Sequence, residues 1–226
     1  MKVIIVGGVA GGASCAARLR RLDETAEIVM VERGPYVSYA NCGLPYHVGG
    51  VIEQERSLLV ATERTFRETF AIDVRTNCEA VSIDRGSKTI ALRDAVTGAV
   101  TAESYDRLVL SPGGASIRPK LPGIDLPGIF EVRTVPDARA IRAWVERGTE
   151  FLAGMNTYSG IQMLRPALRA VVVGGGFIGL ETAENLRHRG FEVTLVEMAD
   201  QVLAPLDRDF ARLVEGHLAM TGVAVS

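Results

Sequence analysis

The chain has 226 residues, with 25 Lys and Arg against 27 Asp and Glu and a net charge of −2. It has no Lys/Arg run, which excludes an extended surface for nucleic acid or anionic membranes, and its hydrophobic fraction of 47% is ample for a packed α/β core. Its three cysteines form no CxxC pair and no Cys/His cluster, so neither a disulfide framework nor a metal site is indicated.

The first part of the chain predicts a strand, a glycine turn, a helix and a second strand. These elements cover residues 3–6, 7–12, 13–22 and 28–31, and the second strand ends at Glu32. The first strand is a short apolar run, which is typical of a buried parallel sheet. It is too short for a signal peptide or a membrane span, so we expect a cytoplasmic protein.

The middle of the chain predicts helices on either side of a set of short antiparallel strands. The helices cover 62–70 and 136–147, and the strands cover 78–84, 88–93 and 100–105. A buried strand at 108–110 leads into the loop 111–114, and several prolines mark the irregular connector that follows.

The opening pattern recurs from residue 170. Strand, glycine turn, helix and strand cover 171–173, 174–179, 180–189 and 193–196, and the last strand ends at Glu197. Two such copies predict an α/β fold with two Rossmann-like dinucleotide-binding domains of the three-layer ββα type. A final helix and a short strand, 210–220 and 223–225, leave the second domain incomplete, because a doubly wound sheet needs further strands.

The second glycine turn carries a full dinucleotide fingerprint. Gly174 makes the tight turn, Gly176 lets a pyrophosphate approach the backbone, and Gly179 lets the helix pack closely on the strand. Glu197 lies at the sequence distance expected of a ribose-binding acid. A glycine turn in a fold that binds no nucleotide is the alternative, and the strand and helix around the turn argue against it.

The first glycine turn departs from this pattern. Gly7 and Gly12 occupy its outer positions, but Val9 takes the middle one. Glu32 still supports a nucleotide site, because an acid that ends the second strand can accept hydrogen bonds from ribose hydroxyls. A solvated carboxylate at the strand end is the alternative for Glu32.

Cys42 lies in the loop 38–50, which enters a short helix. We expect Asn41 to cap this helix and Cys42 to occupy its first turn, where the helix dipole lowers a thiol pKa. Such a thiolate beside a flavin could attack a disulfide sulfur. From spacing alone, a buried structural cysteine would be the better prediction.

The segment SYANCGLPY (38–46), with GGVAGG (7–12) before it and GGGFIGLE (174–181) after it, resembles the single-cysteine branch of the pyridine nucleotide–disulfide oxidoreductases. It is most similar to the FAD-dependent coenzyme A-disulfide reductases, including their rhodanese-fused and persulfide-reducing relatives. The resemblance covers nearly the whole chain. It implies FAD in a domain at 1–147 and NADH, with NADPH as a second option, in a partial domain at 148–226. It also implies a homodimer and a coenzyme A disulfide or persulfide as the substrate.

The resemblance implies a role for each matching residue. Cys42 is the catalytic residue, which cycles between a thiolate and a mixed disulfide with coenzyme A. The residues expected to contact FAD or the nicotinamide cofactor are Gly7, Gly8, Val9, Ala10, Gly11, Gly12, Glu32, Arg33, Asn41, Val81, Ser111, Pro112, Gly113, Gly174, Gly176, Phe177, Ile178, Gly179, Glu181 and Glu197. The residues expected to contact the substrate are Arg18, Arg21, Ser38 and Asn41.

Structural alternatives apply to the weaker candidates. A solvated helix face is the stronger interpretation of Arg18 and Arg21, and loop hydrogen bonding accounts equally well for Ser38 and Asn41. Capping is the alternative for Glu181. We interpret the other two cysteines, Cys15 and Cys78, as core residues.

Two rival functions stay open. An NADH oxidase or peroxidase cycles its cysteine through sulfenic acid, but the peroxidase branch has a histidine in the first glycine turn, where this chain has Ala10. A catalytically inactive fragment that binds nucleotide at most is the second rival, because the later parts of the family's domains do not follow. The segment 148–169 is also longer than the family's usual link, and a helical hairpin, an insertion and a sequence artefact are the alternatives that stay open for it.

Overall fold

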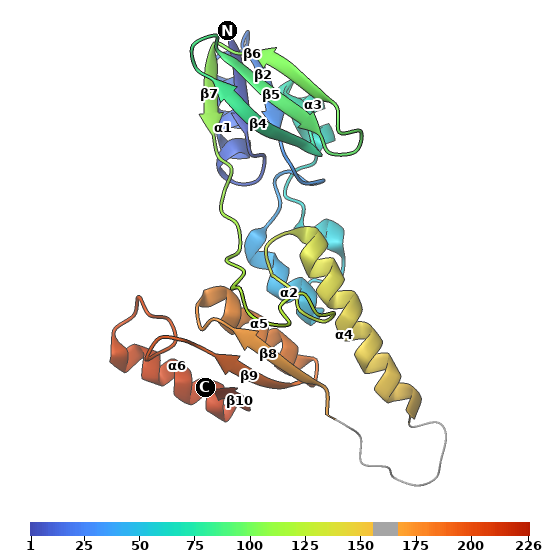
Figure 1. Cartoon of the computed structure of the whole chain (residues 1–226), viewed down its shortest axis with the longest axis vertical. Coiled ribbons are helices and arrows are strands. Elements are labelled where there is room, and N and C mark those ends of the chain that lie inside the picture. The colour runs from blue at the N-terminus through green and yellow to red at the C-terminus, as the bar shows by residue number, and fades with distance from the viewer. Residues whose placement is uncertain (156–166) are drawn as a thin grey trace. The chain divides into compact units, whose positions relative to one another are not determined.

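The structure is a computed structural model that describes residues 1–155 and 167–226 (Figure 1). It divides into two compact units, each built from two segments of the chain. Unit 1 comprises Met1–Ala40 and Leu59–Ala115, and unit 2 comprises Asn41–Leu58 and Ser116–Ser226. The assignment of residues 1–147 to a FAD-binding domain and of residues 148–226 to a partial NADH-binding domain stays a prediction.

Unit 1 contains a four-stranded parallel sheet in the order β3-β2-β1-β7. Its strands are β1 (Lys2–Val6), β2 (Glu27–Val31), β3 (Asp73–Arg75) and β7 (Arg107–Leu110). Val3 of β1 pairs with Ile28 on one side and with Arg107 on the other. The predicted strands of this sheet are confirmed. The sequence did not predict β3, because three residues of which two are charged carry no apolar pattern.

Two helices cover one face of this sheet, α1 (Gly11–Leu22) and α3 (Glu63–Phe70). Ile5 of β1 is fully buried in a cluster that also contains Ala16 of α1 and Phe66 of α3. Because successive side chains of a strand point to opposite faces, Ile5 faces these helices and its neighbour Ile4 faces away from them.

A second sheet covers the opposite face of the parallel sheet (Figure 1). It is antiparallel and contains, in this order, β4 (Cys78–Asp84), β5 (Thr89–Asp94) and β6 (Val100–Ser104). Ile4 of β1 is buried with Ile90 and Leu92 of β5. Helices, parallel sheet and antiparallel sheet therefore form the predicted three-layer ββα arrangement in unit 1.

Unit 2 contains a three-stranded parallel sheet in the order β10-β9-β8. Its elements are the 3-10 helix η1 (Asn41–Gly43), α2 (Leu44–Gly49), the 3-10 helix η2 (Glu55–Leu58), α4 (Val135–Met155), β8 (Arg169–Val173), α5 (Phe177–His188), β9 (Glu192–Val196), α6 (Arg208–Met220) and β10 (Val223–Val225). α5 packs on β8 and β9, and α6 packs on β10. This is the start of the second Rossmann-like domain predicted from the repeated pattern.

β8 leaves apolar side chains uncovered within the described residues. Val171 and Val173 are 67% and 77% exposed. Parallel strands of doubly wound sheets are normally covered on both faces. The sheet of unit 2 is therefore an incomplete layer, as predicted.

α4 is longer than the predicted helix at 136–147. It continues past Gly148, and the Thr149 hydroxyl donates a hydrogen bond to the carbonyl of Glu146 inside the helix. One glycine costs a helix only about 1 kcal/mol, which is too little to end a helix that packs on other elements. The first part of the expected link 148–169 is therefore helical, and the hairpin or insertion predicted for the rest falls on 156–166, outside the described residues.

Candidate functional site

The first glycine turn joins β1 to α1 in unit 1. Gly7 has a φ of +95°, in the left-handed region that favours glycine. A Cβ on Gly12 would lie 1.7 Å from the carbonyl oxygen of Gly7, so no larger residue fits where α1 starts. The turn therefore needs both outer glycines for its own conformation, before any ligand is considered.

The carboxylate of Glu32 braces this turn. Oε2 accepts a hydrogen bond from the backbone N–H of Gly8, and Oε1 accepts one from that of Gly34, each at 2.8 Å. Each oxygen keeps a lone pair with which it could accept a ribose hydroxyl, so the predicted role of Glu32 is compatible with the brace. The brace itself was not predicted, although the two-residue spacing to Gly34 suits a side chain-to-backbone bond.

The start of α1 suits a phosphate group. No side chain caps the helix at Ala10, and its first turn, which lies within the described residues, carries no acid. Free N–H groups at the positive end of a helix attract anions. The turn that contains Val9 and Ala10 can therefore hold a pyrophosphate through its backbone.

The loop that begins at Ser111 packs directly on the first glycine turn. A Cβ on Gly7 would lie 2.0 Å from the carbonyl oxygen of Ser111, and a Cβ on Gly11 would lie 2.9 Å from its Oγ. The Ser111 N–H also donates to the carbonyl of Val6 at 2.7 Å, which extends the pairing of β7 with β1. The structure thus brings Ser111, Gly7 and Gly11 together, and their predicted contact with FAD stays a prediction.

The remaining cofactor candidates of unit 1 are Arg33, Val81, Pro112 and Gly113. Arg33 and Pro112 are exposed, and Gly113 has a φ of +69°. Val81 stands at a β-bulge in the pairing of β4 with β5, a feature that re-aims a side chain. Contact of these residues with FAD stays a prediction.

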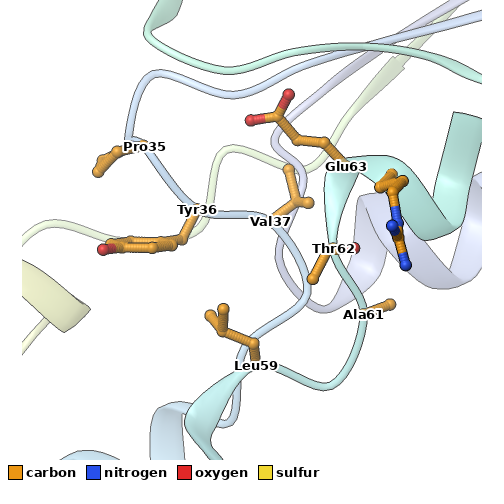
Figure 2. Close-up of a pocket in the computed structure, with 8 residues that line it drawn as sticks. Pro35, Tyr36, Val37, Leu59, Ala61, Thr62 and Glu63 are labelled. Atoms are coloured by element: carbon orange, nitrogen blue, oxygen red, sulfur yellow. The ribbon is translucent and has the colours of Figure 1, made fainter. Parts of the chain in front are cut away.

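Ser38 ties the segment after β2 to the first glycine turn. Its N–H donates to the carbonyl of Gly8 at 2.9 Å, and its own carbonyl accepts from the Val60 N–H at 2.7 Å. Unit 1 also contains a pocket, which lies between the segment 35–37, directly before Ser38 in the sequence, and the segment 59–64 (Figure 2). None of the described residues that line this pocket belongs to the predicted site.

The arginines of α1 have different surroundings. Arg20 donates to the carbonyls of Phe70 and Ala71 at the end of α3, at 2.7 and 2.9 Å. Arg18 and Arg21 are exposed, and within residues 1–155 and 167–226 neither has an ion pair or a side-chain hydrogen bond. Residues three apart are neighbours on a helix surface, so these two cations are together available to an anionic ligand.

The second glycine turn joins β8 to α5 in unit 2 and repeats the first. Gly174 has a φ of +104°, and a Cβ on Gly179 would lie 1.9 Å from the Gly174 carbonyl oxygen. At Gly176, in contrast, a Cβ would have no atom within 4 Å among the described residues. The backbone of Gly176 therefore faces open space, which is the room that a pyrophosphate requires.

Glu197 braces the second turn as Glu32 braces the first. Its carboxylate accepts hydrogen bonds from the N–H groups of Gly175 and Ala199, the latter at 2.8 Å. These bonds, that of Ala199 above all, hold the pKa of the Glu197 carboxyl below its ordinary value, so the group is ionised at neutral pH. In each unit the acid binds the second glycine of the turn and the residue two positions after itself.

Cys42 lies in η1, ahead of α2. α2 begins at Leu44 with Gly43 as its N-cap, and no side chain caps it. The prediction that Asn41 caps this helix and places Cys42 in its first turn is therefore wrong. Pro45 explains the later start, because proline has no N–H and fits a helix only in its first turn.

The thiol of Cys42 is exposed, so Cys42 is not a buried structural cysteine. Cys15 and Cys78 are half-buried and pack against the two core clusters of unit 1, as predicted. Burial raises the pKa of the Cys78 thiol, which keeps it protonated and unreactive. Of the three cysteines, Cys42 is the exposed one.

At the start of α5, Phe177 and Ile178 are 65% and 58% exposed, beside the open face of Gly176. Glu181 is half-buried, and its carbonyl accepts a hydrogen bond from the side chain of Asn185 at 2.8 Å. No side chain caps α5, so Glu181 does not serve as its cap.

No group of three or more His, Cys, Asp and Glu side chains that could hold a metal ion occurs within residues 1–155 and 167–226. None of the helices in this part of the chain combines the length and the apolar character that crossing a membrane requires.

Comparison with known sequences gives consistent matches. A family model described as pyridine nucleotide-disulphide oxidoreductase matches residues 1–226. The coenzyme A disulfide reductase of Staphylococcus haemolyticus is 35% identical over 217 residues, which are 96% of this chain and 45% of that protein. The chain thus spans a little under half the length of this curated relative.

Solved structures also resemble the chain. The reduced CoADR-RHD of Bacillus anthracis superposes with a TM-score of 0.89 at 46% identity, covering 99% of this chain and 37% of that one. An NAD-dependent persulfide reductase from A. fulgidus gives 0.87 at 38% identity, covering 100% and 39%. A water-forming NADH oxidase from Lactobacillus brevis, bound to NADH, gives 0.86 at 28% identity, covering 100% and 46%.

Proposed function

Because this chain belongs to the pyridine nucleotide-disulphide oxidoreductase family, we propose that it forms the FAD-binding region and part of the NADH-binding domain of an enzyme that reduces coenzyme A disulfide or a related persulfide. The observation that supports this most is the combination of two glycine turns, each braced by an acid, with one exposed cysteine, Cys42. The complete activity is proposed for the full-length protein that carries this sequence, which we expect to be a cytoplasmic homodimer.

The residues present fit both cofactors. The uncapped start of α1 and the brace of Glu32 suit the pyrophosphate and the adenosine ribose of FAD. The open face at Gly176 and the brace of Glu197 suit the same groups of NADH. Bound FAD would supply the chemistry that the side chains lack, the acceptance of two electrons from NADH and their transfer to sulfur.

Cys42 would carry out thiol–disulfide exchange. Its thiolate attacks one sulfur of the substrate, breaks the sulfur–sulfur bond and releases one coenzyme A thiolate, which takes up a proton. The mixed disulfide that remains on Cys42 is cleaved when it receives the two electrons of NADH. The second coenzyme A then leaves as a thiolate that takes up a proton, and the Cys42 thiolate is restored.

Four residues would hold the substrate. Arg18 and Arg21 are exposed cations without partners among the described residues, and they suit the phosphates of coenzyme A. Ser38 and Asn41 flank Cys42 in the sequence and would contact the part of the substrate near the disulfide.

The choice between disulfide and peroxide rests on proton transfer. Cleavage of a peroxide needs a group beside the cysteine that manages protons, and Ala10 cannot do so. Exchange with a disulfide needs only an accessible thiolate. We therefore expect the full-length protein to reduce coenzyme A disulfide, or a coenzyme A persulfide, on the order of 10²-fold more efficiently than hydrogen peroxide. The reason is that the cleavage of peroxide would proceed without general acid–base catalysis. Steady-state rates with NADH and each acceptor test this, and a preference for peroxide would refute the assignment.

We also expect NADH to be preferred over NADPH. The ionised carboxylate of Glu197 would repel the 2′-phosphate of NADPH, and the next residues, Met198, Ala199 and Asp200, offer no cation to accommodate it. The ratio of kcat/KM should favour NADH by about tenfold or more, which corresponds to about 1.4 kcal/mol.

Removal of the Glu197 charge should narrow this preference. In Glu197→Gln the ratio of kcat/KM for NADH to that for NADPH should fall to a few-fold. The control is Glu192→Gln, at the exposed glutamate that begins β9, the strand that ends directly before Glu197, and it should keep the ratio of the parent. A parent protein that used NADPH better than NADH would contradict this role of Glu197.

A further inference from the structure

The helix that follows Cys42 packs on the helix that follows the second glycine turn. These are α2 and α5, which both belong to unit 2 and contact each other (Figure 1). Leu44 and Val48 of α2 are buried, with 2% and 0% of their surfaces exposed. Because Cys42 precedes α2 by two residues, the position of α2 determines where the thiol is presented.

Asn185 of α5 and Gly49 of α2 form the closest part of this contact. Asn185 is 1% exposed, and its Nδ2 donates to the carbonyl of Glu181. Within the described residues its Oδ1 has no hydrogen-bond partner. A Cβ on Gly49 would lie 2.1 Å from this oxygen and 2.7 Å from the Cβ of Asn185. Only glycine at position 49 therefore lets α2 approach α5 so closely.

Backbone conformation does not explain Gly49. The next residue, Gly50, ends the helix with a φ of +84°, which itself favours glycine, whereas Gly49 lies within α2 and has no positive φ. Gly49 is the last residue of α2, so the helix itself does not need a glycine there, and a buried acceptor without a donor destabilises a protein. A close contact built on such an acceptor requires a reason other than stability.

We propose that Gly49 and Asn185 are positioning residues, which fix α2, and with it Cys42, on the nucleotide-binding helix α5. The Oδ1 of Asn185 lies where a Cβ on Gly49 would be placed, and a buried polar group in such a position tolerates only one alignment of two helices along their axes. An apolar contact of the same size would let the helices slide past each other. The inference rests on the proposed function, since only there is Cys42 the reacting group.

The test uses the full-length protein and reads the reactivity of Cys42 directly. Three measurements are made: the rate of alkylation by iodoacetamide as a function of pH, kcat for coenzyme A disulfide, and kcat/KM for NADH. In Gly49→Ala the alkylation rate and kcat should each change on the order of tenfold to a hundredfold, because small displacements of a reacting group have large effects. The kcat/KM for NADH should stay within about twofold, since it reports the step in which NADH binds and delivers its electrons and the glycine turn is not altered.

Two further variants make the test specific. Asn185→Gly, added to Gly49→Ala, removes the side chain that the new methyl group would meet, but it also removes the positioning oxygen. The alkylation rate should therefore stay away from the parent value, whereas simple relief of a clash would return it. Gly216→Ala is the matched control, because Gly216 also lies in a helix and a Cβ there would have no neighbour within 4 Å among the described residues. It should behave as the parent does.

The proposal is overturned if Gly49→Ala keeps the alkylation profile and kcat of the parent, if the double variant returns to the parent values, or if kcat/KM for NADH changes in parallel with kcat. Should Gly49→Ala not fold, Asn185→Ala takes its place and should shift alkylation and kcat together. Inactivity of the parent protein toward every coenzyme A disulfide and persulfide would refute the proposed function instead, and the alkylation rates would still decide the positioning.

Discussion

Replacement of Cys42 by serine in the full-length protein should lower kcat for coenzyme A disulfide by a factor on the order of 10³ or more, with FAD still bound. A serine hydroxyl cannot form the mixed disulfide and is not ionised near neutral pH, so the first step of exchange is lost. The side chain is exposed and differs from serine by one atom, so folding should be unaffected. NADH oxidation with coenzyme A disulfide measures the loss, and FAD released on denaturation measures cofactor content.

A second cysteine of the chain provides the control for this variant. Cys15 is half-buried in α1 and packs against the core of unit 1, so Cys15→Ser should reduce the disulfide at a rate close to that of the parent. A Cys42→Ser protein that still reduced the disulfide would show that another group attacks the substrate. Loss of FAD from this variant would show that the change had damaged the fold.

Replacement by alanine should affect stability at one glycine of the second turn and NADH binding at another. Gly179→Ala places a methyl group 1.9 Å from a backbone carbonyl oxygen, and should lower the free energy of unfolding by about 1–3 kcal/mol or more. Gly176→Ala meets no atom within 4 Å among the described residues and should change stability by less than about 0.5 kcal/mol. Its methyl group would instead occupy the space proposed for the pyrophosphate, and KM for NADH should rise by about tenfold or more.

Thermal unfolding and NADH titration of both variants separate these effects. The expected pattern is an unstable Gly179→Ala and a stable Gly176→Ala that binds NADH poorly. A Gly176→Ala protein with the NADH affinity of the parent would show that the cofactor does not approach this backbone.

Local patterns in the sequence predicted most of the elements. The apolar run of β1 and the alternating strands β4 to β6 lie within a residue or two of their predicted ranges, because neighbouring residues decide them. Helix limits were less predictable. Asn41 resembles an N-cap in the sequence, but Pro45 sets the start of α2, and α4 continues beyond Gly148 because one glycine costs a helix too little to end it.

The contacts that shape the candidate site are not local. The bond of Glu32 to Gly8 joins residues that are adjacent only after β1 and β2 have paired. The approach of Asn185 to Gly49 depends on two helices from distant parts of the chain. A sequence pattern suggests which residues bind a ligand, but it does not show which residues hold the binding groups in place.

The bracing of both glycine turns by their acids also changes what the acids contribute to binding. A backbone that is already fixed loses little conformational entropy when a phosphate arrives, so part of the affinity is established when the protein folds. Glu32 and Glu197 would therefore strengthen the binding of ligands that they never touch. Inorganic pyrophosphate, which has no ribose to offer a carboxylate, would bind less tightly to a turn whose acid had been replaced.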